Sequence, residues 1–367
     1  MKNLLVTGGS GFIGSHTCLN LLNKGYKIVV LDSNINSSIK SLENVLKIGQ
    51  IEGKDFSNHL FFVKGDIREE ILIEKVFKKF QKLNMKIDAV IHFAGLKSVS
   101  QSLKDPILYW DNNVNGSINL FKSMYRNNCK TIVFSSSATI YGQNNNLIKE
   151  DSIKNPINPY GETKLAIEKI LKSIHSGFDD SWRIANLRYF NPIGAHSSGL
   201  IGEDLVKIPN NIFPIICQVA IGSRKNINIF GSDWPTFDGT CIRDYVHIMD
   251  LAEAHTRALE FLLLNAPQAI DLNIGTGKGT SVLDLLNTFE RTNNCKISYE
   301  FTERRLGDAC EVVANNELAF KLLNWEPKRT ISEMCKDGWK WTTMNPKGYG
   351  NKSNINKVKG LQVIELS

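Results

Sequence analysis

Tyr160 and Lys164 stand four residues apart in the sequence, a spacing at which the two side chains could carry out acid–base chemistry. Pro159 sets a helical φ at its own position and disfavours helix in Asn158, so we expect a helix to begin near Tyr160. Residues four apart share a helix face, and a nearby ammonium favours the phenolate form of tyrosine. We therefore expect the Tyr160 pKa to fall from about 10 toward neutrality, as a general base requires. The alternative is an ordinary helical pair, because two fixed residues recur in many sequences.

A glycine-rich turn near the amino terminus supplies a second feature with possible chemistry. Gly8, Gly11 and Gly14 follow an apolar run over residues 3–7, and helical spacing continues from there to Gly25. This order predicts strand, turn and helix. Glycines let a backbone approach a pyrophosphate closely, and the helix amino terminus presents free N–H groups to it. The alternative is a glycine turn that merely lets a helix pack on a strand.

Asp32 supports the dinucleotide interpretation of that turn. It ends a second predicted strand, residues 27–31, about 20 residues after the glycines. A carboxylate at this place can accept hydrogen bonds from an adenosine ribose. Residues 33–38 contain no arginine that could hold a 2′-phosphate, so the sequence favours NAD over NADP.

Strand and helix patterns continue to alternate through the first half of the chain. Predicted strands over residues 60–64, 87–93 and 131–134 end next to Asp66, Ala94–Gly95 and Ser137. The strand at 87–93 is almost wholly apolar, as a strand buried on both faces of a parallel sheet should be. Ligands bind at the carboxyl ends of such strands, so these residues should line one crevice. The cluster Ser135–Ser137 could instead be a solvated turn.

Composition limits the class of protein. The 367 residues allow one large α/β domain with a smaller lobe, or two domains. The seven cysteines form no C-x-x-C pair, and the seven histidines are scattered, so we expect no metal site and no disulfides. The net charge of +7 is spread along the chain, which argues against nucleic-acid binding. We find no leader and no membrane-spanning apolar run, and therefore expect a cytoplasmic protein without a membrane partner.

Longer motifs narrow this interpretation. The sequence resembles the UDP-glucose 4-epimerase family of the extended short-chain dehydrogenase/reductase superfamily over nearly its whole length. The motifs that carry the resemblance are Thr7–Gly14, Gly65–Ile67, Ala94–Lys97, Asp111–Gly116, Phe134–Gly142, Tyr160–Lys164, Leu187–Pro192, Ile208–Asn211 and Asp238–Tyr245.

The resemblance implies a Rossmann-type doubly wound parallel sheet followed by a smaller mixed α/β lobe. It implies C4 epimerisation of a UDP-hexose with tightly bound NAD, and a homodimer that packs through helices near residues 107–124 and 165–174. We place the NAD-binding domain at residues 1–190, the UDP-sugar lobe at 191–346 with some crossover between them, and a mobile tail at 347–367.

By the same resemblance, specific residues receive roles. Ser137, Tyr160 and Lys164 would be catalytic. Cofactor-binding residues would be Gly8, Gly11, Phe12, Ile13, Gly14, Asp32, Asn36, Ser37, Asp66, Ile67, Phe93, Ala94, Gly95, Lys97, Asn112 and Tyr189. Substrate-binding residues would be Asn191, Asn211, Ile212, Phe230, Arg243, Arg305, Asp308 and Val312.

Two other functions remain open at this stage. A nucleotide-sugar 4,6-dehydratase would need an extra acid–base pair, and residues 137–140, Ser-Ala-Thr-Ile, contain no carboxylate. A non-catalytic NAD-sensing regulator on the same fold would typically lose the tyrosine or the lysine, and this chain keeps both.

Val312 bears on which sugars fit. In the family a tyrosine at this position restricts the pocket to glucose and galactose, so a valine is expected to leave space for an acetamido group. The alternative is that Val312 packs in a core strand with Val313.

Overall fold

The computed structural model describes residues 1–142, 147–204, 211–305, 308–350 and 360–366. Its largest feature is a sheet of eight strands in the order β10-β6-β5-β4-β1-β2-β3-β14. Every neighbouring pair in it is parallel. The strands are β1 (Asn3–Thr7), β2 (Lys27–Asp32), β3 (Leu60–Lys64), β4 (Ala89–His92), β5 (Thr131–Ser137), β6 (Arg183–Tyr189), β10 (Ala269–Ile274) and β14 (Gln362–Val363). The predicted Rossmann-type fold is confirmed.

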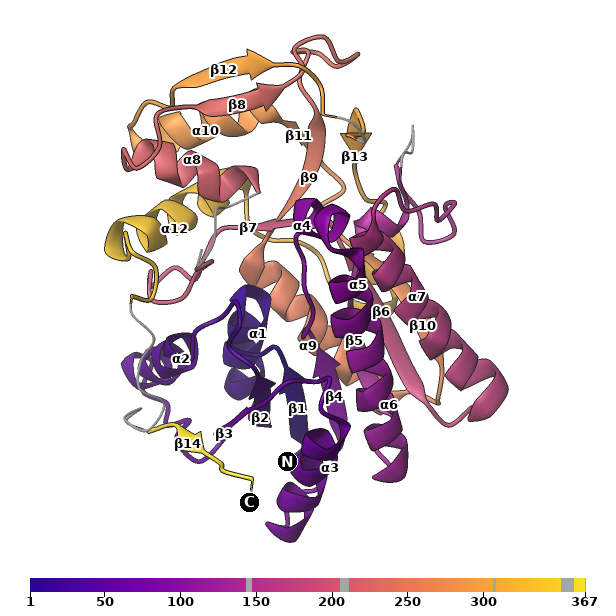
Figure 1. Cartoon of the computed structure of the whole chain (residues 1–367). Helices are drawn as coiled ribbons and strands as arrows, with labels where there is room; N and C mark the ends of the chain where they lie inside the picture. The colour runs from indigo at the N-terminus through magenta and orange to yellow at the C-terminus, as the bar shows by residue number, and fades with distance from the viewer. Residues whose placement is uncertain (143–146, 205–210, 306–307, 351–359, 367) are drawn as a thin grey trace.

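Helices cover both faces of this sheet (Figure 1). One apolar cluster joins one face of the sheet to α1, α2, α9 and α11, and a second joins the other face to α3, α6 and α7. The helices are α1 (Phe12–Asn23), α2 (Lys40–Ile51), α3 (Glu70–Lys82), α6 (Gly116–Arg126), α7 (Pro159–Ser173), α9 (Ile248–Leu264) and α11 (Glu317–Leu323).

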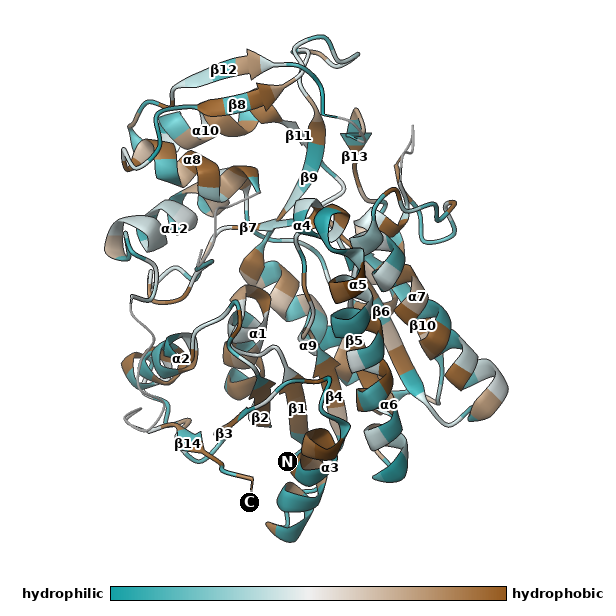
Figure 2. Ribbon diagram, in the orientation of Figure 1, coloured by the Kyte–Doolittle hydropathy of each residue, from teal (hydrophilic) through white to brown (hydrophobic). Residues whose placement is uncertain are grey.

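Burial on both faces explains why the strands read as continuous apolar runs. Leu4 and Val6 of β1 enter the first cluster, whereas Leu5 between them enters the second. Side chains alternate along a strand, so each face needs its own apolar residues. In Figure 2 β1, β2 and β4 are accordingly brown, while the covering helices α3 and α6 carry both colours.

A smaller lobe faces the carboxyl ends of the large sheet (Figure 1). Its apolar core includes Ile216, Tyr245 and Phe289. The strands are β7 (Asn191–Ile193), β8 (Ile227–Phe230), β9 (Ile242–His247), β11 (Gly279–Ser281), β12 (Tyr299–Thr302) and β13 (Glu311–Val312). The helices are α8 (Ile212–Ala220), α10 (Val282–Asn293) and α12 (Ile331–Met344).

The chain crosses between the two lobes. After β9 in the smaller lobe, α9 packs in the first cluster with α1, and β10 then pairs with β6 in the large sheet. Residues 248–274 thus belong structurally to the larger layer, although they lie after residue 190 in the sequence. The proposed boundary near residue 190 includes this crossover.

The last described residues differ from the sequence expectation. Residues Gln362 and Val363 form β14, which pairs with Phe61 and Phe62 of β3 at the edge of the large sheet. Ile364 also packs against the second cluster. The prediction of a mobile tail is therefore wrong for this part of residues 347–367, because an open sheet edge offered backbone partners. Residues 351–359 and 367 lie outside the described residues.

The helix expected near residues 107–124 changes its hydrogen bonding midway. The short helices α4 (Val99–Lys104) and α5 (Pro106–Tyr109) lead into a π-helical segment, Trp110–Asn115, and then into α6. Such segments are frequent at functional sites because they shift the face that a helix presents. This one buries Asn112 and Asn113. In the part of the chain that the structure describes, no helix has the length and apolar character to cross a membrane.

Candidate active site

The helix α7 carries the Tyr160–Lys164 pair. Asn158 precedes it in an extended conformation, and its side chain accepts a hydrogen bond from Gly161 N at 2.9 Å. Pro159 occupies the first helical position, where its missing N–H costs nothing. The helix therefore begins where the sequence predicts. The Lys164 Nζ atom lies 5.9 Å from the centre of the Tyr160 ring, so the two side chains share a face.

That face of α7 packs against the carboxyl end of β5. Lys164 Nζ donates a hydrogen bond to the Ser135 carbonyl oxygen at 2.6 Å and lies 4.9 Å from the centre of the Phe134 ring. The Ser137 hydroxyl is hydrogen-bonded to the Tyr160 phenol. The structure thus brings Ser137, Tyr160 and Lys164 together, and their catalytic roles stay a prediction.

Burial sets the protonation of this pair. Burial raises the pKa of Tyr160 to about 12, although the hydrogen bond with Ser137 acts in the opposite direction and lowers this pKa. It also lowers the pKa of Lys164 to about 7, and the charge of Glu168 partly opposes that change. The expectation of a phenol pKa near neutrality is therefore wrong. A lysine that loses its proton near pH 7 has no charge left at the pH where this phenol would ionise.

The glycine turn is closed so tightly that side chains could not fit. Gly8 has a φ of +70°, and a Cβ there would lie 2.7 Å from Ala94 N. A Cβ at Gly14 would lie 2.3 Å from Gly8 O. These contacts bring the loop after β1 against both α1 and the loop after β4, which leaves backbone rather than side chains at the carboxyl edge of the sheet.

The amino terminus of α1 follows directly. Gly11 is its N-cap and gives no side-chain cap. The backbone N–H groups of Phe12 and Ile13 belong to the first turn, where no intrahelical acceptor exists. This turn can therefore bind an anion such as a pyrophosphate.

The Asp32 carboxylate ties together the loops beside that turn. It accepts hydrogen bonds from Ser10 N at 3.0 Å, Asn34 N at 2.9 Å and Ser37 Oγ at 2.8 Å. Burial raises the Asp32 pKa, and these hydrogen bonds oppose the rise. Asn36 is exposed on the same loop. Asp32 and Ser37 thus form one polar group, with Asn36 beside them.

Asp66 has a partner that the sequence analysis missed. Its Oδ2 atom accepts a hydrogen bond from Arg68 Nη2 at 2.8 Å, and Arg68 also reaches Asp111 at 3.1 Å. The Arg68 guanidinium holds the Asp66 pKa below its usual range. Ile67 is buried against Gly116, where a Cβ would lie 2.7 Å from its side chain.

The loop after β4 approaches Lys164. Ala94 N donates to Thr7 Oγ1 at 3.3 Å, and Thr7 Oγ1 lies 2.7 Å from His92 Nδ1. At Gly95 a Cβ would lie 3.9 Å from Lys164 Nζ, so a larger residue would narrow the space beside the ammonium.

Asn113 is a positioning residue that the sequence analysis did not single out. Its side chain accepts from Leu96 N at 2.8 Å and donates to Leu96 O at 3.1 Å. It also donates to Thr163 Oγ1 of α7 at 3.1 Å. Asn113 thereby fixes the loop after β4 to α7. Its place in the motif Asp111–Gly116 was the available signal.

Further predicted cofactor residues lie at the same edge of the sheet. Tyr189 Oη lies 2.6 Å from His255 Nε2, and the Phe93 ring centre lies 4.8 Å from that of His255. Burial raises the Tyr189 pKa and lowers that of His255 to about 4. Lys97 forms an ion pair with Glu203 at 2.7 Å, a contact that the sequence did not suggest.

Three predicted substrate residues meet in the smaller lobe. The Arg305 guanidinium carbon lies 4.4 Å from the centre of the Phe230 ring at the end of β8. Arg305 Nε also donates to Asp308 Oδ2 at 2.9 Å. The cation on an aromatic face, beside a carboxylate, forms a surface suited to a nucleoside and its phosphates. Residues 306–307 lie outside the described part of the chain.

A second group forms along β9. Arg243 lies opposite Val312 of β13, and β7 with Asn191 pairs with the other part of β9. Val312 is half-buried against an apolar cluster that contains Ala138 and Phe190. Asn211 is the exposed N-cap of α8, and its neighbour Ile212 begins that helix.

Over the described residues no three His, Cys, Asp or Glu side chains gather as a metal site, and all seven cysteines are free.

Comparison with known proteins now bears on these sites. Residues 5–338 match the family described as GDP-mannose 4,6 dehydratase. A bifunctional UDP-glucose 4-epimerase and UDP-xylose 4-epimerase of Arabidopsis thaliana is 47% identical over 353 residues, which cover 96% of this chain and 98% of the relative. The UDP-glucose 4-epimerase of Bacillus subtilis (strain 168) is 46% identical over 94% of this chain and 98% of its own.

The chain belongs to the UDP-glucose 4-epimerase family.

Structural similarity agrees with this membership. The crystal structure of a family member from Bifidobacterium longum in complex with NAD+ and UDP has a TM-score of 0.86 and 42% identity, and covers 95% of this chain and 100% of that one. Membership in the epimerase family places the chain within the extended short-chain dehydrogenase/reductase superfamily, as predicted.

The glycine turn indicates whether NAD fits this chain. The positions where a Cβ would collide, Gly8 and Gly14, are those that bring the backbone to the amino terminus of α1. Asp32 and Ser37, the predicted ribose partners, lie beside it, and residues 33–38 contain no arginine. The residues present therefore fit a dinucleotide without a 2′-phosphate.

Proposed function

We infer that this protein catalyses the reversible C4 epimerisation of UDP-glucose and UDP-galactose, with NAD retained as a prosthetic group. The carrying observation is the convergence of Ser137, Tyr160 and Lys164 at the carboxyl edge of the sheet. Membership in the epimerase family indicates which reaction these three residues carry out. Bound NAD, which the glycine turn and Asp32 would hold, would supply a reversible hydride acceptor for C4 of the sugar, so net redox would be zero.

The chain's own residues move the proton. Tyr160 takes the proton of the sugar 4-hydroxyl and gives it back to the same oxygen when the hydride returns to C4. Ser137, which is hydrogen-bonded to the phenol, also hydrogen-bonds that sugar hydroxyl. Lys164, held by the Ser135 carbonyl, contributes positive charge beside the forming phenolate. Because burial raises the phenol pKa to about 12, positive charge beside the phenol is needed to make Tyr160 a base.

The sugar must turn over between the two hydride steps, so binding energy should reside in the nucleotide. Phe230 and Arg305 support that distribution, since a stacked aromatic ring and a guanidinium recognise uracil and pyrophosphate. Arg243 on β9 is the second proposed pyrophosphate partner. Asn191, Asn211, Ile212 and Asp308 complete the proposed set.

A 4,6-dehydratase is the main alternative, because the chain also matches the family of that description. Elimination of water needs a further acid–base pair at the site. Ser137 is followed by Ala138, Thr139 and Ile140, and Thr139 Oγ1 donates to Ser137 Oγ at 3.0 Å. The 3-10 turn after β5 thus offers a hydroxyl where a carboxylic acid would be required.

We further propose that the enzyme interconverts UDP-GlcNAc and UDP-GalNAc. Val312 lies opposite Arg243, and its half-buried side chain packs against the cluster that contains Ala138, next to Ser137. A side chain at position 312 therefore lies near Arg243, the proposed pyrophosphate partner, and near the strand end that carries Ser137. From there it would border the sugar. Valine leaves more space there than a tyrosine would.

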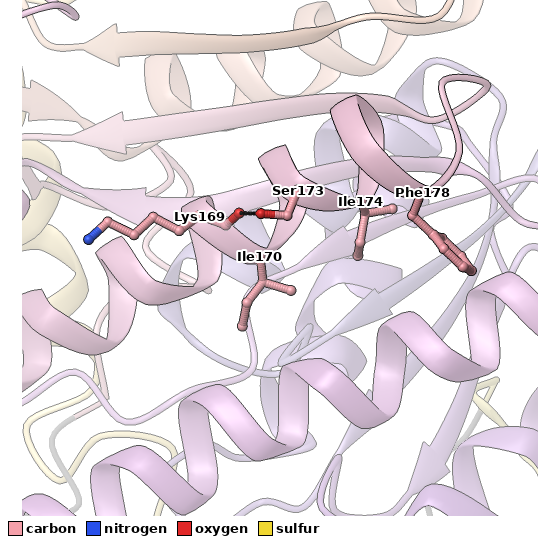
Figure 3. Close-up of a pocket in the computed structure, with 5 residues that line it drawn as sticks. All are labelled: Lys169, Ile170, Ser173, Ile174 and Phe178. Atoms are coloured by element: carbon pink, nitrogen blue, oxygen red, sulfur yellow. Dashed lines mark hydrogen bonds between the residues drawn. The ribbon is translucent and has the colours of Figure 1, made fainter.

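A homodimer is also proposed, through α5, α6 and α7. Ile107 is 80% exposed and Phe178 63% exposed, and apolar side chains that gather on a surface mark protein interaction sites. Figure 3 shows Ile170 near the end of α7, with Ile174 and Phe178 of the π-helical segment Ile174–Phe178 that follows it; these side chains line a surface pocket together with Lys169 and Ser173. An Ile170→Glu variant should be monomeric by light scattering, and a wild-type monomer would refute the proposal.

The cytoplasm is the proposed compartment. Seven free thiols, five of them buried, suit a reducing environment.

One assay separates the functions considered. Purified protein without added NAD is incubated with UDP-galactose, and the products are identified. UDP-glucose is expected. A 4-keto-6-deoxy sugar would instead indicate a dehydratase, and no conversion with NAD still bound would indicate a regulator.

A further inference from the structure

The helix α7 meets β5 at three consecutive serines, and the proposed reaction uses the first and last. The backbone of Ser135 holds Lys164. The middle residue, Ser136, donates its hydroxyl to the carboxylate of Glu168, which lies one helical turn beyond Lys164. The spacing of four residues places Glu168 on the same helix face as the catalytic pair.

Glu168 is a buried carboxylate with a fixed partner. It is 5% exposed, and Arg188 of β6 is 0% exposed. Arg188 Nη2 reaches Glu168 Oε2 at 2.7 Å, and its Nε reaches Oε1 at 3.0 Å. Arg188 is itself held by Tyr141 Oη at 2.9 Å, and it also pairs with Asp271. Because β5 and β6 place Ser136 opposite Arg188, both donors approach Glu168 from neighbouring strands.

The surroundings of Lys164 contain few charges. Glu168 acts on it from its own helix. His92, from β4, is neutral because burial lowers its pKa to about 3. From β5 come only the Ser135 carbonyl and the Phe134 ring, and Tyr160 faces it as a neutral phenol. Among the described residues, Glu168 is thus the charged side chain that favours the ammonium form.

We propose that Glu168 is a positioning residue for the reaction: its buried carboxylate, fixed by Ser136 and Arg188, holds the Lys164 side chain in its ammonium form beside Tyr160. The proposal rests on the proposed function in naming Tyr160 and Lys164 as the reacting pair. It predicts that the Lys164 pKa would fall further if the Glu168 carboxylate were removed. A purely structural ion pair would stabilise the fold without this effect.

The test is to titrate Lys164 directly in the purified protein with its bound cofactor. Lysine labelled with ¹³C at Cε is incorporated, and the Lys164 resonance is assigned by its loss in Lys164→Met. Glu168→Gln keeps the side-chain shape and removes the charge. We expect the Lys164 titration midpoint to fall by about one pH unit, a tenfold loss of proton affinity. An unchanged midpoint would overturn the proposal.

Asp250→Asn is the matched control. Asp250 is also a fully buried carboxylate paired with an arginine, Arg329, but it lies on α9 away from the catalytic helix. This variant should lose stability and keep the Lys164 midpoint. An equal displacement in both variants would mean that general loosening, rather than the Glu168 charge, moves Lys164, and would overturn the proposal.

Kinetics and a second variant complete the test. Glu168→Gln should lower kcat with little change in KM, because the nucleotide is bound in the other lobe; a change in KM alone would contradict the proposal.

If Glu168→Gln does not fold, the Ser136→Ala variant decides. Loss of the serine donor strengthens the carboxylate field, so the Lys164 midpoint should rise, and an unchanged or lower midpoint counts against the proposal. Absence of epimerase activity in the wild type would refute the proposed function without affecting the titration.

Discussion

Lys164 Nζ lies 2.6 Å from the carbonyl oxygen of Ser135, inside the contact between α7 and β5. The backbone of the strand therefore fixes the position of the ammonium, while burial weakens its charge. This combination makes the protonation of Lys164 sensitive to anything that enters the site.

The first prediction concerns stability and pH. Burial lowers the Lys164 pKa from 10.5 to about 7 in the folded protein. Between these two pKa values the unfolded chain binds more protons than the folded protein, so the free energy of unfolding rises with pH. Below about pH 7 Lys164 is charged in both states, and the folded protein then bears the full cost of burying the ammonium. In cofactor-free protein, the wild type should gain up to about 2–3 kcal/mol relative to Lys164→Met between pH 7 and 9. Urea unfolding at both pH values measures this gain, and parallel curves would contradict it.

Replacement of the base is the second prediction. Tyr160→Phe removes one hydroxyl and leaves the ring in place, so folding and NAD content should be retained. Turnover of UDP-galactose should fall by about 100- to 10,000-fold, the usual range for loss of a general acid–base group. Near-normal turnover in a variant with full NAD content would show that another group is the base.

The third prediction separates cofactor retention from catalysis. Asp32→Ala should lose NAD during purification, because the variant lacks the carboxylate that accepts the ribose hydrogen bonds. Each such bond to a charged acceptor contributes about 1.5–3 kcal/mol to binding. The bonds from Ser10, Asn34 and Ser37 to this carboxylate also disappear, so the loop itself should loosen. NAD released by denaturation is quantified by absorbance. Asp250→Asn is the control, and equal NAD content in the Asp32 and Asp250 variants would refute the role of Asp32.

Sugar specificity provides the fourth prediction. Wild type should convert both UDP-galactose and UDP-GalNAc, and Val312→Tyr should lose the second activity while it keeps the first. Val312→Ala, which adds no bulk, should keep both. The idea fails if the wild type does not convert the acetylated sugar, or if the tyrosine variant converts it as well as the wild type does.

Much of the fold could be predicted because its signals are local. The apolar run ending at Thr7, the glycines after it and the strand ending in Asp32 specify a strand–turn–helix–strand unit without reference to distant residues. Asn158 and Pro159 likewise fix the start of α7 within a few positions. The π segment at Trp110–Asn115 was missed, because its hydrogen bonding has no signature in apolar spacing.

Charge and partnership could not be predicted in this way. The sequence places Lys164 near Tyr160, and from proximity alone the phenol pKa should fall. The tertiary structure buries both groups, so desolvation outweighs the pair interaction and the phenol pKa rises to about 12. The same limit hid Arg68 beside Asp66 and Asn113 between the loop after β4 and Thr163.

The sequence by itself therefore determined the strands of the sheet, the glycine turn, the start of α7 and the family, since each depends on residues close together in the chain or on motifs. The tertiary structure alone placed β14 beside β3, Arg305 over Phe230 and Arg188 against Glu168. The partners in the first of these contacts are about 300 residues apart. Such pairings, and the electrostatics that follow from them, depend on which surfaces remain open after the local elements have packed, and no local pattern records that outcome.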